Sequence, residues 1–472
     1  MREVRIGDRA IDSGPTVFTM RWVFEELFAR AGAVLDERLD TERVEILARH
    51  AWGPGPPLDL HADRERSADA IAAFAGPEEG RRYLRFCARA RGIYQTLERP
   101  FIRAQRPNPF SLSRDVAAER LSGLGRIQPF GTLWQALSRE LRDPRLRQLF
   151  ARYATYCGSS PYLAPATLML VAHVEQEGVW LIRGGMHRLA QALQRLCAER
   201  GVRFRFGTAA REILVTGAGV TGVQLDSGEQ LPCRAVICNA DAAGLAAGHL
   251  GQGASRAVSP VPAAARSLSA LTWSMTASTR GFPLLRHSVF FSGDYPREFE
   301  DIFRRRQLPG EPTVYVCAQD RGAESAPAPV APERLFLLVN APARGDTAPF
   351  APEEIARCQS RTFALLERCG LHVDHRPEAT VVTSPRELEQ LFPGTGGALY
   401  GQASHGWRAS FTRPAAWTRI PGLYLAGGST HPGPGVPMAA MSGRLAAECL
   451  ISYLGSTARS SRAAMPGGTP TP

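Results

Sequence analysis

Lysine is missing from this 472-residue chain, so all 56 of its basic side chains are arginine. Against 45 acidic residues they give a formal net charge of +11. The arginines are scattered among acidic residues, and the sequence has no nucleic-acid reader motif or basic face interleaved with aromatic residues. These absences argue against nucleic acid as a partner. The positive charge fits attraction to an anionic membrane surface better.

Paired cysteines and long apolar runs are missing as well. The nine cysteines are odd in number and contain no C-x-x-C pair, which is typical of a reducing compartment and argues against a disulfide framework or a zinc site. No run reaches the roughly 18 apolar residues that a membrane span needs, and the N-terminus lacks a signal-peptide core. We therefore expect no metal, and a cytoplasmic protein that associates peripherally with the inner or photosynthetic membrane.

Apolar periodicity predicts the secondary structure of much of the chain. Residues 2–12 indicate a hairpin, and residues 21–31 an amphipathic helix. Residues 66–155 are helical in pattern. Several strand-like runs recur over residues 268–340, and a helix follows over residues 352–369.

The central part of the chain has a more detailed pattern. A strand at residues 179–182 precedes a helix that ends at Gly201. The run VRFRF at residues 202–206 then predicts the first strand of a meander, which ends in a buried strand at residues 235–238. Residues 456–472 are polar and rich in proline, which predicts a disordered tail.

A glycine- and proline-rich stretch near the C-terminus, AGGSTHPGPGVPMAAMSGR, occupies residues 426–444. A short buried strand is predicted at residues 422–426, and a helix begins after Val436, with proline tolerated in its first turn. A strand, a glycine loop and a helix N-terminus together form a site for an anion or a dipole. Alone, this pattern does not identify the ligand.

Five collinear stretches carry a more specific signal, and together they resemble the carotenoid (phytoene-type) desaturases. They are IDSGPTVFTMRWVFEELF (11–28), YCGSSPYLAPATL (156–168), WLIRGGMHRLAQAL (180–193), FFSGDYPREFEDIF (290–303) and LYLAGGSTHPGPGVPMAAMSGR (423–444). These desaturases are FAD-dependent members of the amine-oxidase-like flavoproteins. The resemblance extends from Arg2 to about Tyr453 and is strongest to the hydroxycarotenoid 3,4-desaturases, also called methoxyneurosporene dehydrogenases.

The resemblance implies a mixed α/β fold, that of a two-domain FAD- or NAD(P)-binding flavoprotein of the amine-oxidase and phytoene-desaturase type. The expected division is a discontinuous FAD-binding domain, a substrate- and membrane-associating domain, and a disordered tail. Their residues are 1–60, 175–245 and 395–455 for the first, 61–174 and 246–394 for the second, and 456–472 for the tail.

One motif of such flavoproteins is absent. They normally begin with a strand, a G-x-G-x-x-G turn that opens a helix, and an acidic residue about twenty positions later. Met1 lies where the family continues after this element, so we expect the N-terminal Rossmann-like βαβ unit to be incomplete, by about 40 residues. A start site assigned too far downstream is favoured over a true truncation, which would leave an inactive fragment without flavin.

The implied reaction removes two hydrogens from adjacent carbons of an acyclic carotenoid, with FAD as the acceptor. The segment TMRWVFEELF at residues 19–28 favours C-3,4 desaturation of 1-hydroxy carotenoids such as 1-hydroxyneurosporene. A phytoene or neurosporene desaturase and a carotene isomerase of the same fold are the alternatives. The oligomeric state stays open.

The resemblance also implies which residues contact FAD. The turn at residues 427–428 is expected beside the pyrophosphate and ribityl chain, and the N–H groups near Gly435 at the flavin pyrimidine. His431 is equally compatible with a packing role. The full expected set is Asp12, Gly14, Pro15, Thr16, Gly184, Gly185, Ala210, Gly427, Gly428, Ser429, His431, Gly435, Val436 and Met438.

Three polar residues are candidates for contact with a substrate hydroxyl or for proton removal: Arg183, His287 and Asp294. Aromatic and apolar residues are candidates for the lining of a polyene tunnel, although each is also compatible with an ordinary core position. The tunnel candidates are residues 156–170, Trp273, Phe290, Phe291 and Tyr295.

Overall fold

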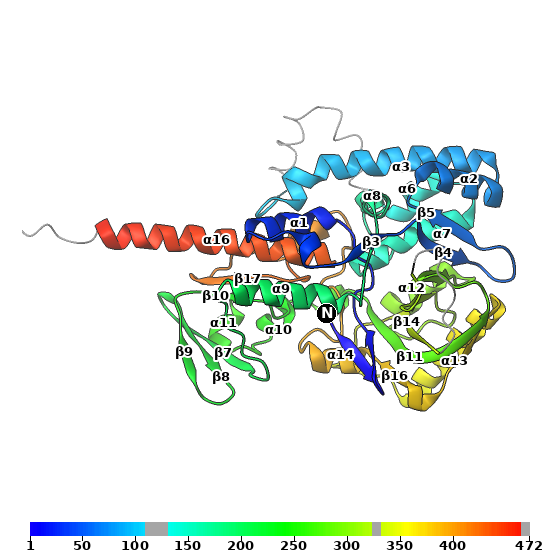
Figure 1. The fold of residues 1–472 in the computed structure, drawn as a ribbon. Helices are drawn as coiled ribbons and strands as arrows, with labels where there is room; N and C mark the ends of the chain where they lie inside the picture. The colour runs from blue at the N-terminus through cyan, green and yellow to red at the C-terminus, as the bar shows by residue number, and fades with distance from the viewer. Residues whose placement is uncertain (109–130, 323–331, 464–472) are drawn as a thin grey trace, which may run out of the picture.

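The computed structural model describes residues 1–108, 131–322 and 332–463. A helical layer lies above a large sheet, and a small parallel strand pair with its helices and a meander lies beside them (Figure 1). The predicted hairpin at the start of the chain is confirmed as β1 (Glu3–Ile6) and β2 (Arg9–Asp12). The predicted amphipathic helix follows as α1 (Arg21–Arg30).

The large sheet has eight strands and is mixed. Its order is β15-β11-β14-β13-β12-β4-β5, with β16 beside β11. The strands are β4 (Ile46–Ala51), β5 (Leu58–His61), β11 (Ser269–Gly281), β12 (His287–Phe290), β13 (Val314–Ala318), β14 (Glu333–Ala341), β15 (Leu371–Asp374) and β16 (Thr380–Thr383). The strands predicted within residues 268–340 are thus confirmed. β4 and β5 also join this sheet, although the sequence groups residues 1–60 with the cofactor domain.

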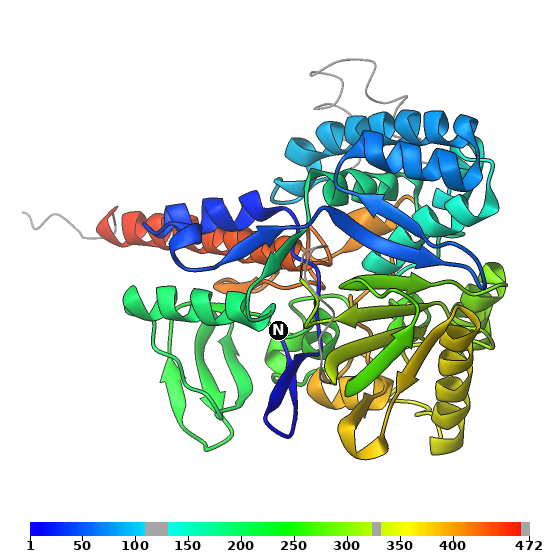
Figure 2. The same ribbon diagram turned by 45° about the vertical axis from the view of Figure 1, so that its right-hand side comes forward.

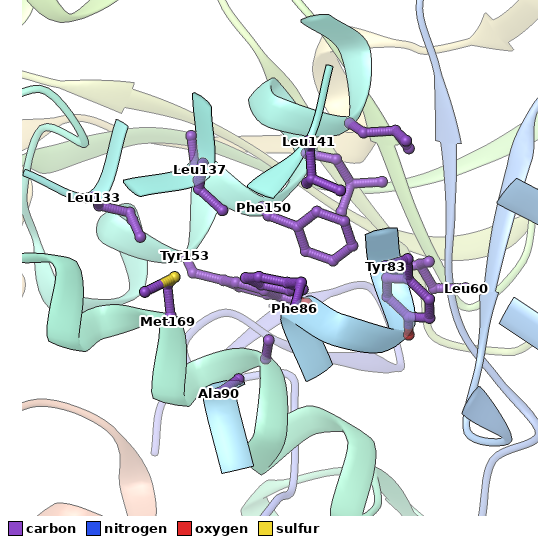
Figure 3. Packing of buried hydrophobic residues seen from close by; sticks show 14 of the residues in the cluster. Leu60, Tyr83, Phe86, Ala90, Leu133, Leu137, Leu141, Phe150, Tyr153 and Met169 are labelled. Atoms are coloured by element: carbon purple, nitrogen blue, oxygen red, sulfur yellow. The ribbon is translucent and has the colours of Figure 1, made fainter. Parts of the chain in front are cut away.

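One face of the sheet packs against the helical layer. The layer consists of α2 (Arg64–Ala75), α3 (Pro77–Leu97), α6 (Leu133–Glu140), α7 (Pro144–Ala151) and α8 (Leu170–Glu177). Its core includes Tyr83, Phe86 and Phe150, with the Phe86 and Phe150 ring centroids 4.7 Å apart (Figure 3). The predicted helical pattern is therefore confirmed for the described part of residues 66–155.

The opposite face of the sheet packs against α13 (Pro352–Arg368), the yellow helix at the outer edge of the sheet in Figure 2. Successive strand residues point to opposite faces, and this alternation corrects two predicted tunnel residues. Trp273 and Phe290 lie in the α13-side core. The indole Nε1 of Trp273 donates a hydrogen bond to Gln359 Oε1 at 3.0 Å. Phe291 and Tyr295 belong to the helical-layer core instead.

The small parallel pair consists of β10 (Val236–Cys238) and β17 (Leu423–Leu425). Around it lie α9 (His187–Glu199), α16 (Val436–Ala463) and the antiparallel meander of β7 (Ala210–Thr216), β8 (Gly219–Leu225) and β9 (Gln230–Pro232), while β3 (Thr41–Arg43) pairs with β6 (Trp180–Ile182). α16 continues through residues 456–463, where the sequence predicts a disordered tail; residues 464–472 lie outside the described range.

The strand predicted at VRFRF is wrong. Residues 202–206 have no strand assignment, because no described strand forms a ladder with them. Phe204 and Phe206 instead stack on each other with ring centroids 5.6 Å apart, and the Phe206 side chain is 72% exposed.

Short helices connect these parts. They are η1 (Leu35–Glu37), η2 (Glu98–Ile102), η3 (Arg152–Cys157), η4 (Ala166–Met169), α10 (Ala242–Ala246), α11 (Gln252–Ser255), η5 (Ala263–Ala265), α12 (Tyr295–Phe299), η6 (Glu300–Arg305), η7 (Pro377–Ala379), α14 (Pro385–Leu391) and α15 (Ala409–Thr412). Within the described parts of the chain, no helix has both the length and the apolar character required to cross a membrane.

Candidate functional site

A cavity of about 260 Å³ lies between the helical layer and the glycine-rich loop. Its walls come from residues 19–20, 97–102, 156–174, 404–413 and 432–438. Most of the lining side chains are apolar. The cavity is therefore suited to a hydrophobic molecule that reaches the glycine-rich loop.

The start of α16 forms one end of this cavity. Gly435 and Met438 both line it. Gly435 adopts a φ of 107°, which favours glycine, and its carbonyl accepts the N–H of Ala439 at 2.9 Å. The first N–H groups of a helix have no acceptor within the helix, and they carry the positive end of its dipole. The predicted contacts at Gly435, Val436 and Met438 are compatible with this arrangement.

The turn before α16 is fixed by a buried serine that the sequence analysis did not identify. Ser442 Oγ accepts the N–H of Gly427 at 2.7 Å and donates to the carbonyl of Ala439 at 2.7 Å. A Cβ atom at Gly427 would lie only 2.9 Å from Asn239 Nδ2. Gly428 has open space, because its nearest neighbour would be 4.0 Å away. The loop thus presents bare backbone on this side.

Ser429, expected at the ribityl chain, forms its hydrogen bonds within the protein. Its Oγ accepts the N–H of Ala242 at 3.2 Å and interacts with the carboxyl of Asp241. Burial raises the pKa of Asp241, while its hydrogen bonds act in the opposite direction. Asp241 and Asn239 follow β10 directly, at the carboxyl end of the parallel pair, where ligands usually bind in such sheets. In the sequence, the signal that could have indicated Asn239 and Asp241 is the polar end of the run VICNAD.

Asp12, expected at the flavin, caps a helix. Its carboxylate accepts the N–H of Met186 at 2.7 Å and that of His187 at 3.1 Å, at the start of α9. Burial raises the pKa of Asp12, although these two backbone hydrogen bonds lower it. Gly185 lies so close that a Cβ there would be 2.3 Å from Asp12 Oδ2.

Gln319 fixes the same turn to the large sheet. Its amide side chain donates to the Asp12 carbonyl at 2.7 Å and accepts the Asp12 N–H at 3.0 Å. The following turn, with Gly14, Pro15 and Thr16, thereby lies over the sheet. The Thr16 hydroxyl is 2.7 Å from the hydroxyl of Tyr315 on β13.

The remaining predicted cofactor residues, Ala210, Gly184 and His431, are not part of the cavity lining. Ala210 begins β7 and is exposed. Gly184 is packed under the Arg188 side chain. The His431 ring contacts η2 and the turn after it: its ring meets Phe101 edge-on at 5.2 Å, and its Nε2 lies 2.9 Å from the Ala104 carbonyl. These contacts favour the packing role for His431.

The three candidate catalytic residues do not converge. The side chain of Arg183 is 76% exposed and pairs with Asp40 at 2.9 Å. Asp294 is exposed and caps α12 by accepting the N–H of Arg297 at 3.1 Å. His287 is buried on β12 and faces the helical layer, with its Nδ1 2.7 Å from the Tyr315 hydroxyl. Of the three, only His287 is enclosed.

Arg413 is a buried cation in the cavity wall that the sequence analysis missed. Its guanidinium donates to the carbonyls of Tyr400 at 2.9 Å, Gln402 at 2.7 Å and Gly428 at 3.4 Å. Burial lowers the pKa of Arg413, but a guanidinium keeps its proton. One arginine among 56 carries no distinguishing signal in the sequence.

Comparisons with known proteins show the family of the chain. Residues 1–451 match the family described as "Flavin containing amine oxidoreductase". Hydroxyneurosporene desaturase of Rubrivivax gelatinosus is 54% identical over 100% of this chain and 90% of its own length. The protein of the same name from Rhodobacter capsulatus is 42% identical over 93% and 88%. A 4,4'-diapolycopene oxygenase of Methylomonas sp is 28% identical over 94% and 89%.

Solved structures of low sequence identity share the fold. An oxidoreductase from Methanosarcina mazei matches with a TM-score of 0.54 at 13% identity, over 94% of this chain and 90% of that one. A redesigned putrescine oxidase matches with a TM-score of 0.55 at 12% identity, over 97% and 90%. These matches confirm the predicted fold class.

Proposed function

Because the chain belongs to the flavin-containing amine oxidoreductase family, we propose that it is an FAD-dependent desaturase of acyclic carotenoids. The reaction is removal of two hydrogens across C-3 and C-4 of a 1-hydroxy carotenoid such as 1-hydroxyneurosporene. Two relatives that are 54% and 42% identical are named hydroxyneurosporene desaturases, which supports this substrate class. The structural observation that carries the proposal is the apolar cavity that ends at the glycine loop and the start of α16.

The residues around the loop fit a flavin. Gly428 faces open space, and Gly435 takes a backbone conformation that L side chains rarely adopt, so backbone N–H groups are presented without side chains in front. The helix dipole of α16 adds partial positive charge at this point. The donor set therefore suits the carbonyl oxygen at the pyrimidine end of a flavin ring, with Arg413 as a nearby cation.

When bound, FAD supplies the redox chemistry, because it accepts the hydrogen that leaves the substrate carbon. The chain itself provides placement and exclusion of water. The cavity walls, which include Phe101, Leu168 and Phe411, enclose a polyene in apolar surroundings. Arg413 holds a fixed positive charge beside the loop, where it favours any negative charge that develops there.

We infer peripheral attachment to a membrane through the cavity-side surface. Leu163 and Trp407 are 49% and 37% exposed, and the loop that carries Trp407 is joined to Leu163 by a backbone hydrogen bond from Gly406. The exposed Arg408 lies over the Trp407 ring. Apolar side chains beside a cation suit an anionic bilayer surface. A Trp407→Ser variant is expected to sediment less with vesicles that contain phosphatidylglycerol, and equal sedimentation would contradict this attachment.

Pigment analysis tests the function directly. A host that accumulates 1-hydroxyneurosporene is compared with and without this protein. We expect a new carotenoid with one more conjugated double bond and a red-shifted absorption spectrum. Unchanged pigment in the presence of folded, flavin-containing protein would exclude the proposed reaction. A host that accumulates neurosporene serves as the matched control for substrate class.

A further inference from the structure

A group of polar side chains is buried beside the cavity, between the large sheet and the helical layer. We call it the polar chamber: Arg152 and Tyr156 from η3, His287 from β12, Tyr295 from α12, and Tyr315 from β13. Arg152 is 8% exposed, and His287 and Tyr295 are each 4% exposed. Burial of so many polar groups in one place requires compensation.

That compensation is incomplete within the described ranges of the chain. Among the described residues, Arg152 Nε, His287 Nε2 and the Tyr295 hydroxyl have no hydrogen-bond partner. Buried polar atoms are almost always paired, with protein, water or a ligand. Three unpaired atoms in one chamber therefore indicate that a polar group from outside the chain belongs there.

These side chains are close to one another. The Arg152 guanidinium lies 4.9 Å from the centroid of the Tyr156 ring. Burial lowers the pKa of His287 to about 3, and the charges of Arg286 and Arg152 add to this effect. Burial also raises the pKa of Tyr295, in part opposed by Arg152. The chamber thus contains a permanent cation, a neutral imidazole and a neutral phenol.

The chamber joins the cavity to the turn predicted to contact the flavin. Tyr156 lines the cavity and also neighbours Tyr315, whose pKa is raised mainly by burial and further by Cys317 and Tyr156. The Tyr315 hydroxyl lies 2.7 Å from Thr16 Oγ1 and 2.7 Å from His287 Nδ1. A molecule that extends from the cavity toward Thr16 therefore passes this group of polar atoms.

The proposed substrate has one polar group, and it lies close to the reacting carbons. In a 1-hydroxy carotenoid the oxygen on C-1 lies about 3 to 5 Å from C-3 and C-4, by ordinary bond lengths. Whatever binds the hydroxyl must therefore lie close to the reacting carbons and to the flavin. Resting on the proposed function, we infer that Arg152, His287 and Tyr295 bind the C-1 hydroxyl, while the polyene trails through the apolar cavity.

This arrangement explains how a hydroxylated substrate is selected. An alcohol both donates and accepts, so it can pair with the Arg152 donor and with the Tyr295 or His287 acceptor. A carotenoid that lacks the hydroxyl leaves these atoms unpaired, and sites built to bond a hydroxyl reject such analogues strongly.

Selectivity between two substrates tests the inference. Purified wild-type protein, Tyr295→Phe and Arg152→Gln are assayed with 1-hydroxyneurosporene and with neurosporene. We expect kcat/KM for the hydroxylated substrate to fall about 10-fold or more in each variant, chiefly through KM, with no loss for neurosporene. Tyr83→Phe removes a buried hydroxyl from the same helical-layer core, outside the chamber, and is expected to keep the wild-type ratio.

Equilibrium binding of the two polyenes, followed by tryptophan fluorescence quenching, separates the possible failures. If the wild type binds the hydroxylated polyene preferentially but converts neither polyene, the proposed function is wrong and the proposed hydroxyl site in the chamber is supported. If Tyr295→Phe keeps the wild-type binding ratio, the chamber does not bind the hydroxyl, even when the proposed reaction is correct. Should Arg152→Gln not fold, Tyr295→Phe decides the question alone, because the Tyr295 hydroxyl has no partner among the residues that the structure describes.

Discussion

The glycine-rich loop and the polar chamber both contribute residues to the wall of the same cavity, and they differ in how their buried polar groups are paired. In the loop, Gly427 is bonded to Ser442 and Ser429 to Ala242. In the chamber, Arg152, His287 and Tyr295 each keep a buried polar atom without a partner in the described chain.

This difference separates a structural role from a role in ligand binding. A segment whose hydrogen bonds are closed within the chain holds its shape in the absence of any ligand. A segment with unpaired buried atoms is less stable than it could be, and it gains its missing contacts when a ligand arrives. Substitutions in the first region should therefore reduce stability, and substitutions in the second should change selectivity.

The largest effect is expected at Gly185, in the turn beside Asp12, whose hydrogen bonds are likewise formed within the described chain. Its φ of 97° disfavours any other residue, and a new Cβ would lie 2.3 Å from Asp12 Oδ2. Gly185→Ala should cost about 3 kcal/mol or more, from backbone strain and the loss of the Asp12 cap on α9. Chemical denaturation measures this loss. Gly443→Ala in α16 should be neutral or stabilising, because an added Cβ there would meet nothing within 4 Å beyond its own stretch of helix. Equal losses of stability in the two variants would contradict the prediction.

The next effect is a pH dependence near the chamber. Burial raises the pKa of Glu298 to about 7, although Thr313 and Asn340 bond to its carboxyl. The folded protein therefore holds this proton at pH values where the unfolded chain, with its pKa near 4.5, has lost it. Stability should fall by up to about 3 kcal/mol as the pH rises from 4.5 through 7.

Melting temperatures of the wild type and Glu298→Gln at pH 5 and pH 8 isolate this contribution. We expect the variant to lose less stability than the wild type between the two pH values. Buried neutral histidines act in the opposite direction, because His50 and His287 have lowered pKa values, and they are common to both proteins. An identical pH dependence in both proteins would refute the role of Glu298.

A smaller loss of stability is expected from Ser442→Ala, at the glycine-rich loop. Ser442 is fully buried and accepts from Gly427, so its removal leaves the Gly427 N–H unpaired at the start of the loop. We expect a cost of about 1 to 3 kcal/mol. Ser360→Ala, which removes an exposed helical hydroxyl of similar local bonding, should cost clearly less in the same denaturant titration.

The smallest effect on stability should come from the chamber. Tyr295→Phe removes a hydroxyl that has no partner in the described part of the chain, so the free energy of unfolding should change by less than about 1 kcal/mol or rise. Tyr153→Phe offers the contrast, because the Tyr153 hydroxyl donates to Glu175 at 2.6 Å. If Tyr295→Phe were the more destabilising of the two, the chamber would be a closed network like the loop.

Sequence reasoning predicted the glycine-rich loop and its flanking elements better than the chamber. The strand, glycine loop and α16 are adjacent in the chain, so their order and residue types suffice to predict them. The cap at Asp12 escaped prediction because its acceptor role depends on Met186, which is 174 positions away. Periodicity likewise showed that strand residues alternate, without showing which face Trp273 and Phe290 would take.

The chamber could not be predicted as a unit. Its unpaired atoms come from η3, β12 and α12, which meet only in the folded chain. His287 was recognised as a polar residue in a strand-like run, and Tyr295 as an aromatic one, but nothing linked them. Arg152 stands in a helical stretch where an arginine normally faces solvent.

The hydroxyl of Tyr315 has one proton to share between two neighbours, and this gives the chain of bonds a direction. If Thr16 donates to Tyr315, then Tyr315 donates to His287 Nδ1, and Nε2 carries the imidazole proton toward the chamber. If His287 Nδ1 holds the proton, the order reverses and Nε2 becomes an acceptor. Whatever contacts Thr16 can therefore set the tautomer of a histidine two hydrogen bonds away. The polar chamber can then bind an alcohol either as hydrogen-bond donor or as acceptor, without movement of a side chain.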